Sequence, residues 1–72
     1  MYYYQRLYDL REAHDKTHAE IATVLGISQQ QYYHYENGGR QLPMHHFITL
    51  AKYYNVSLDY LAGMIDTPKK LY

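Results

Sequence analysis

The chain is 72 residues long, contains no cysteine, and balances seven basic against seven acidic residues. This length is enough for one domain, and the missing cysteines exclude a disulfide framework and a thiolate zinc site. No apolar run approaches the roughly 18 residues of a membrane span, and the acidic N-terminus lacks the apolar segment of a secretion signal, so we expect a cytoplasmic protein that does not enter a membrane.

Helix signals begin near the N-terminus. The apolar residues that recur there at helical spacing are Tyr4, Leu7, Tyr8 and Leu10, with Arg6, Asp9 and Glu12 between them. They predict a first helix that ends near Ala13. Thr17 and Glu20 then form a capping box, in which each side chain accepts the other residue's backbone N–H. Gly26 ends this second helix, because glycine takes the left-handed conformation without strain.

Two more helices are predicted in the middle of the chain. Ser28, followed three residues later by Gln31, caps a third helix over Gln29–Glu36. Pro43 suits the first turn of a fourth helix, where its missing N–H costs nothing, and Asn55 closes that helix. The residues expected on its buried face are Phe47, Leu50, Ala51 and Tyr54.

Ser57 caps a last short helix, which Gly63 stops. No segment alternates with period two, so the sequence predicts an all-α, compact domain of four or five helices over residues 1–66, with a tail at 67–72. Apolar residues continue after the core helices, and they are Leu58, Tyr60, Leu61, Met64 and Ile65. They predict a two-fold dimer contact; the alternative is that this segment folds back and caps the core.

The second and third helices are short and meet at a tight turn over residues 26–28, which is the helix-turn-helix arrangement. Ala22 is small where the two helices approach closely. The residues expected to wedge the helices together are Ile21, Leu25, Ile27, Tyr32 and Tyr35.

From about Arg6 to Gly63 the chain resembles the phage repressor and Cro-like helix-turn-helix family, also called the xenobiotic-response-element type. The matching segments are Leu10-Arg11-Glu12, Thr17 with Glu20-Ile21-Ala22, Leu25-Gly26-Ile27-Ser28, Tyr35-Glu36-Asn37-Gly38, Arg40 with Pro43, Leu50-Ala51-Lys52 and Val56-Ser57-Leu58-Asp59-Tyr60-Leu61. The resemblance implies a lambda-repressor-like fold. It also implies a bacterial or phage-encoded transcriptional regulator that binds double-stranded DNA.

Helical geometry divides the third helix into two sides. One side carries Ser28, Gln31, Tyr32 and Tyr35, and the other carries Gln29, Gln30, Tyr33 and His34. If the first set is core, the second faces the major groove, where a glutamine amide can pair bidentately with adenine. The resemblance implies base contacts at the same four positions of the second set. The alternative is a polar, solvated face that reads nothing.

Other roles come from the resemblance alone. It implies DNA phosphate contacts by His18, Asn37, Gly39 and Arg40. The family usually has glutamine where this chain has His18. The resemblance also implies a structural ion pair between Arg11 and Glu36, which would link the first helix to the end of the third.

Five histidines and eleven tyrosines are the unusual features of the composition. His14 and His18 do not share a continuous helix face and the adjacent His45 and His46 point about 100° apart, so we expect surface histidines and no metal site. The tyrosines expected in the core or at its edge, each with a partner for its hydroxyl, are Tyr32, Tyr35 and Tyr54. Tyr4 should pack; Tyr2 and Tyr3 could extend the first helix, hang free or cover a subunit contact.

Two functions compete. The polar, amide-rich face of the third helix favours a sequence-specific DNA-binding repressor, because a protein-binding face would carry more large apolar anchors. The zero net charge favours a protein-interaction module, such as an antitoxin-like partner. The sequence has no nucleophile motif and no glycine-rich phosphate loop, so we expect neither an enzyme nor a cofactor.

Overall fold

A computed structural model describes residues 2–68 and contains five α-helices there. They are α1 (Tyr3–Ala13), α2 (His18–Leu25), α3 (Gln29–Glu36), α4 (Met44–Tyr54) and α5 (Leu58–Leu61). No strand occurs among the described residues. The all-α fold with a helix-turn-helix is therefore confirmed, while most of the tail predicted at 67–72 lies outside the described residues.

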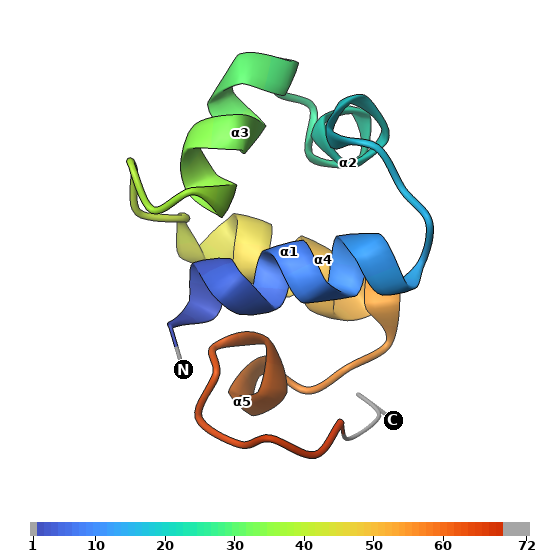
Figure 1. Cartoon of the computed structure of the whole chain (residues 1–72), viewed down its shortest axis with the longest axis vertical. Coiled ribbons are helices and arrows are strands. Elements are labelled where there is room, and N and C mark those ends of the chain that lie inside the picture. The colour runs from blue at the N-terminus through green and yellow to red at the C-terminus, as the bar shows by residue number, and fades with distance from the viewer. Residues whose placement is uncertain (1, 69–72) are drawn as a thin grey trace.

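In Figure 1, α4 lies behind α1 across the middle of the view, with α2 and α3 on one side of them and α5 on the other. The central pair makes contacts in both directions, since α1 packs on α3 and α5 while α4 packs on α2 and α5. This arrangement leaves the outer side of α3 uncovered.

Two capping boxes fix the starts of α2 and α3. The Thr17 hydroxyl accepts the Glu20 N–H at 3.1 Å, and the Glu20 carboxylate accepts the Thr17 N–H at 3.0 Å. Ser28 and Gln31 repeat this exchange at 3.1 and 3.2 Å. Gly26 lies between the boxes with a φ of 71°, a conformation that glycine adopts without strain. The predicted ends of both helices are thus confirmed.

The fourth helix begins one residue later than predicted. Pro43 is its N-cap, with an extended ψ of 151°, and Met44 is the first helical residue. The Pro43 carbonyl accepts the N–H groups of His46 and Phe47, so the proline starts the helix through its oxygen. Asn55 ends the helix in the left-handed conformation, as expected.

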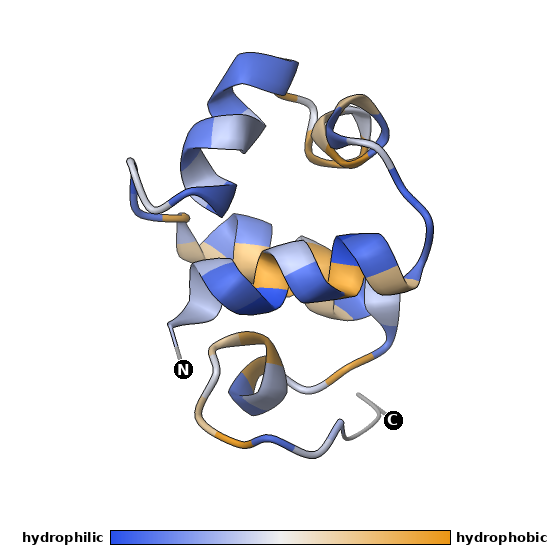
Figure 2. Cartoon of the chain, in the orientation of Figure 1, coloured by the Kyte–Doolittle hydropathy of each residue, from blue (hydrophilic) through white to orange (hydrophobic). Residues whose placement is uncertain are grey.

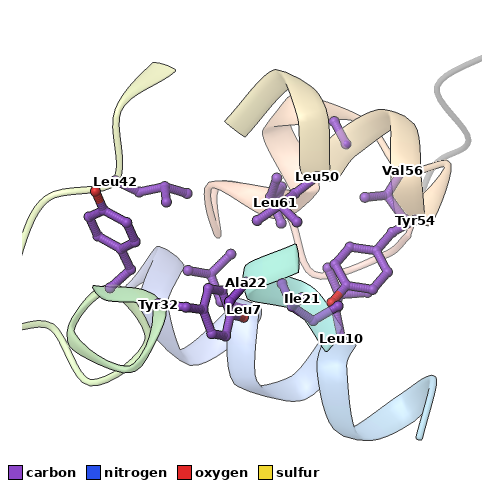
Figure 3. Packing of buried hydrophobic residues seen from close by; sticks show 12 residues of the cluster. Leu7, Leu10, Ile21, Ala22, Tyr32, Leu42, Leu50, Tyr54, Val56 and Leu61 are labelled. Carbon is purple, nitrogen blue, oxygen red and sulfur yellow. The ribbon is translucent and has the colours of Figure 1, made fainter. Parts of the chain in front are cut away.

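All five helices contribute to the core (Figure 3). Its buried apolar residues are Leu7, Leu10, Ile21, Ala22, Tyr32, Tyr35, Leu42, Leu50, Ala51, Tyr54, Val56 and Leu61. Leu25, Ile27 and Phe47, which were expected inside, are only partly buried against this cluster. Burying a large apolar side chain contributes about 1.5–3 kcal/mol, so each helix is held in place mainly by its own core residues.

On α1 the structure reverses two sequence assignments. Tyr8, placed on the apolar stripe, is 44% exposed, whereas Arg6, placed between the apolar residues, is 5% exposed. Arg6 lies over the Tyr60 ring at 3.9 Å and donates to the Ile65 carbonyl at 3.0 Å. Its carbon chain packs while its charge reaches polar groups of the C-terminal segment, which helical periodicity could not indicate.

The C-terminal segment folds back onto α1. As a result, some of the predicted dimer residues are buried and others remain exposed. Leu61 is 0% exposed and belongs to the core, so it cannot contact a partner chain. Tyr60 and Ile65 are partly buried, beneath and beside Arg6. Leu58, at 40%, and Met64, at 78%, remain exposed. The inclusion of Leu61 in a dimer surface was wrong, because its side chain is needed to close the core.

Several polar groups are buried. His46 lies in the interior, so the expectation of surface histidines was wrong for this residue. Burial lowers the pKa of His46, and the neighbouring His45 lowers it further. The hydroxyls of Tyr32 and Tyr54 have no hydrogen-bond partner within the described residues, contrary to expectation. Burial raises the pKa of both groups, which therefore stay protonated.

Within residues 2–68, no helix combines the length and the apolar character needed to cross a bilayer. In the same part of the chain, no three potential metal ligands among histidine and the acidic residues come together.

Candidate nucleic-acid interface

The outer face of α3 is polar and accessible. Gln29, Gln30 and Tyr33 are exposed and His34 is partly exposed. On the opposite side Tyr32 and Tyr35 are buried, while Ser28 and Gln31 are exposed and occupied by the capping box. Figure 2 shows α3 as a predominantly hydrophilic helix beside a more apolar centre. All four side chains predicted to read bases therefore lie on the free face of one helix.

The start of α2 lies beside this face. His18, Gln29, Gln30 and Tyr33 line one shallow hollow between α2 and α3. The His18 ring lies edge-on to the Tyr33 ring, with 5.8 Å between centroids and 79° between planes. Three of the four predicted reading residues are thus brought together with one predicted phosphate contact.

The His18 ring also contacts Glu36. Its Nε2 atom lies 3.3 Å from Oε1 of Glu36, the last residue of α3. The imidazole is therefore turned toward the end of α3. A phosphate contact through His18 has to use the other edge of this ring.

Beneath His18, Arg11 and Glu36 form a buried ion pair. Nη2 of Arg11 lies 2.9 Å from Oε1 of Glu36, and Nε donates to Oε2 at 3.0 Å. Nη1 donates to the Lys16 carbonyl at 2.9 Å, so the guanidinium connects α1, the α1–α2 connection and α3. Hydrogen bonding to Glu36 raises the pKa of Arg11, which offsets the effect of burial. This pair fixes the direction of α3 against α1.

The remaining predicted phosphate residues follow α3 directly, in the loop of residues 37–43 that joins α3 to α4. The Gly39 N–H donates to the Asn37 side-chain oxygen and to the His34 carbonyl, both at 2.9 Å. The Arg40 N–H donates to the same carbonyl at 3.2 Å. These backbone donors are turned inward, so the groups free to meet a phosphate are the Asn37 amide nitrogen and the exposed Arg40 side chain.

A second hollow, of about 370 Å³, lies between α1 and α3 above the ion pair. Its lining residues are Gln5, Tyr8, Arg11, His18, Tyr33, Glu36 and Asn37. Sequence reasoning did not include Gln5 and Tyr8 in the site. Because they are three residues apart, Gln5 and Tyr8 lie on one face of α1. From the sequence, Tyr8 was assigned to the core, so this face was not considered as part of the site.

A family model described as helix-turn-helix matches residues 7–61. The chain belongs to this helix-turn-helix family. The resemblance drawn from the sequence is thereby confirmed.

Two curated proteins are similar to it. An uncharacterized HTH-type transcriptional regulator of Bacillus subtilis (strain 168), YobD, is 39% identical over 66 residues, which are 92% of this chain and 59% of that protein. The cryptic phage CTXphi transcriptional repressor RstR of Vibrio cholerae is 36% identical over 59 residues, 82% of this chain and 53% of the repressor. The chain thus spans little more than half the length of these relatives. No solved structure matches it significantly.

Within the helix-turn-helix unit, sequence reasoning identified the exposed residues well because they lie on one helix. The resemblance also implied the Arg11–Glu36 pair that holds this helix, but nothing in the sequence indicated the contact between His18 and Glu36. The contact of His18 with Glu36 joins the first residue of α2 to the last residue of α3. Only the angle between the two helices brings these residues together.

Proposed function

We propose that this helix-turn-helix chain is a sequence-specific DNA-binding transcriptional regulator that reads the major groove with α3. The observation that carries the proposal is the uncovered outer face of α3, where Gln29, Gln30, Tyr33 and His34 are accessible together. A helix fits the major groove, and the N-terminal residues of a recognition helix meet the base edges first. The rigid attachment of α3 through Arg11 and Glu36 supplies the fixed direction that reading requires.

Each side chain on this face suits a particular contact. The amides of Gln29 and Gln30 can pair bidentately with N6 and N7 of adenine. The Tyr33 ring can pack on a thymine methyl group, or its hydroxyl can donate to a phosphate. The His34 imidazole can donate to an acceptor of guanine or to a phosphate. The face therefore favours operators in which adenine and thymine are read at the positions nearest the start of α3.

Phosphate contacts are few in this proposal. The Arg40 guanidinium and the Asn37 amide lie beside the end of α3, and His18 lies at the start of α2. Since Arg40 is the one permanently charged cation among these proposed contacts, few condensed counterions are released on binding. Non-specific affinity should be weak, and specificity should depend on the base contacts.

Repression by blocking promoter access is the simplest mode of action for a domain of this size, and one relative carries the name of a transcriptional repressor. The proposal includes a two-fold dimer on DNA, with Leu58 and Met64 as its exposed apolar contacts. Such a dimer would place two α3 helices about 34 Å apart, one turn of DNA.

A protein-interaction module, such as an antitoxin-like partner, is the second candidate. Met44 and Ile48 are exposed apolar residues one turn apart on α4, and their side chains are available to contact another protein. This function predicts binding that is independent of DNA and of Gln29 and Gln30.

Selection of bound sequences from a random pool of DNA duplexes tests the main proposal. The wild-type chain should enrich one motif, while the Gln29→Ala and Gln30→Ala variants should relax one or two of its base pairs. Gln41→Ala is the matched control, because Gln41 is an exposed glutamine outside α3. If all four proteins enrich the same motif, α3 is not the reading element. If none enriches any motif, the second candidate is favoured.

A further inference from the structure

Three consecutive tyrosines, Tyr2, Tyr3 and Tyr4, stand at the start of α1, outside the helix-turn-helix unit. The Tyr3 hydroxyl accepts the Leu42 N–H at 3.0 Å and lies 3.5 Å from the Arg40 carbonyl, to which it donates. One side chain at the N-terminus thus holds two backbone groups of the α3–α4 loop, 37 and 39 residues away.

The Tyr3 side chain is itself fixed. Its ring packs edge-on against Phe47, with 5.0 Å between centroids, and against Tyr4, with 5.8 Å. Leu42, whose N–H it accepts, is buried in the core. The hydroxyl therefore satisfies a backbone donor at the point where the loop enters the interior, and the aromatic packing prevents it from moving away.

Tyr4 supports the loop at a second point. A Cβ atom placed on Gly38 would lie 3.1 Å from Cε1 and 3.2 Å from Cζ of Tyr4, so the bare glycine backbone rests on the ring. Gly38 has a φ of 84°, in the left-handed region. Tyr2 stacks on Tyr4, with 5.3 Å between ring centroids and 5° between ring planes.

The loop is therefore held from two sides. The His34 carbonyl accepts the N–H groups of Gly39 and Arg40 on the side of α3, and the tyrosines hold it on the side of α1. We propose that Tyr3 and Tyr4 are positioning residues, which hold the α3–α4 loop so that the Arg40 side chain meets the DNA backbone. This inference rests on the proposed function. It gives the tyrosine run a role in affinity, without contact to a base.

Tyr3→Phe is the sharpest test, because it removes the hydroxyl and keeps the ring against Phe47. Affinity for every duplex should fall by a similar factor, roughly 3- to 10-fold, the equivalent of one hydrogen bond. The selected motif should not change. Tyr53→Phe is the matched control, since Tyr53 is a partly exposed tyrosine on α4, and it should leave affinity unchanged.

A double-mutant cycle separates positioning from mere stabilisation of the fold. If Tyr3 acts through Arg40, Tyr3→Phe should weaken binding in the wild-type background and have little effect in an Arg40→Ala background. Equal losses in both backgrounds would mean that Tyr3 only stabilises the domain, and would overturn the inference. Unchanged affinity on Tyr3→Phe, or on Arg40→Ala, would overturn it as well.

Amide exchange and a second variant distinguish local loosening of the α3–α4 loop from loss of the fold. Amide exchange at Leu42 should accelerate in Tyr3→Phe while exchange at Leu50 stays slow, which shows that the variant is folded. If Tyr3→Phe does not fold, Phe47→Leu replaces it in the same cycle, because it loosens the packing that holds the Tyr3 ring. A wild-type chain that selects no DNA contradicts the proposed function, whereas normal wild-type selection with an uncoupled Tyr3 contradicts only this inference.

Discussion

His18 Nε2 and Arg11 Nη2 approach the same oxygen of Glu36, at 3.3 Å and 2.9 Å. One carboxylate at the end of α3 thus joins α1, α2 and α3. A negative charge at the C-terminal end of a helix is unfavourable beside the helix dipole, so the carboxylate depends on its partners. The orientation of α3 therefore rests on a buried ion pair.

Removing the cation should be costly. Arg11→Ala should lower the free energy of unfolding by about 3–5 kcal/mol, because it leaves the buried Glu36 carboxylate with the His18 imidazole as its remaining partner and without its cation. Replacing both residues, as in Arg11→Met with Glu36→Leu, should recover part of the loss. Lys16→Ala is the control, since Lys16 pairs with Glu20 at the surface at 3.9 Å and should contribute less than about 1 kcal/mol. Urea denaturation measures all three, and equal losses for Arg11 and Lys16 would contradict this reasoning.

The salt dependence of DNA binding should distinguish residues that contact bases from residues that contact phosphates. Gln29→Ala or Gln30→Ala should cost about 1–3 kcal/mol on the best operator and leave the salt dependence almost unchanged, because an amide displaces no counterion. Arg40→Ala should weaken binding to all sequences and reduce the slope of log K against log salt by about one per subunit. Binding titrations at several salt concentrations measure both quantities. The same salt slope in Arg40→Ala and wild type would remove Arg40 from the phosphate contacts.

The buried His46 should make the domain less stable in mild acid. Its pKa in the folded state is lowered by burial and by His45, so below its ordinary pKa the unfolded chain binds more protons than the folded one. The free energy of unfolding should therefore fall as the pH drops from about 7 through the ordinary histidine pKa near 6.5. His46→Gln should remove much of this slope. Denaturation curves between pH 7.5 and 5 test the point, and a slope that persists in full in His46→Gln would assign it to other groups.

Two leucines of α5 offer a matched comparison. Leu61→Ala leaves a cavity in the core and should lower the free energy of unfolding by about 2–5 kcal/mol. Leu58→Ala, at a partly exposed position, should cost much less but weaken any dimer on DNA. Thermal unfolding and light scattering with an operator duplex measure the two effects. A Leu58→Ala variant that assembles on DNA like the wild type would remove Leu58 from the dimer surface.

Local chemistry explains what could be predicted from the sequence. The two helices of the helix-turn-helix unit begin at the capping boxes of Thr17 with Glu20 and Ser28 with Gln31, because each capping contact spans only three residues. The free face of α3 follows from the 100° rotation per residue once Tyr32 is buried. These features depend on neighbours along the chain, so the order of residues determines them.

Apart from the Arg11–Glu36 pair, which the family resemblance implied, tertiary structure alone decided which polar groups are buried and which contacts hold α3 in place. Arg6 reaches Ile65 across 59 residues, and Tyr3 reaches Leu42 across 39. Both contacts depend on how α1 packs against segments distant in the sequence, and so do the exposure of Tyr8 and the burial of Leu61. The spacing of apolar residues predicts which side of each helix is apolar. It does not predict which distant backbone groups the side chains of that helix will contact. That is settled only when all the helices close around one core.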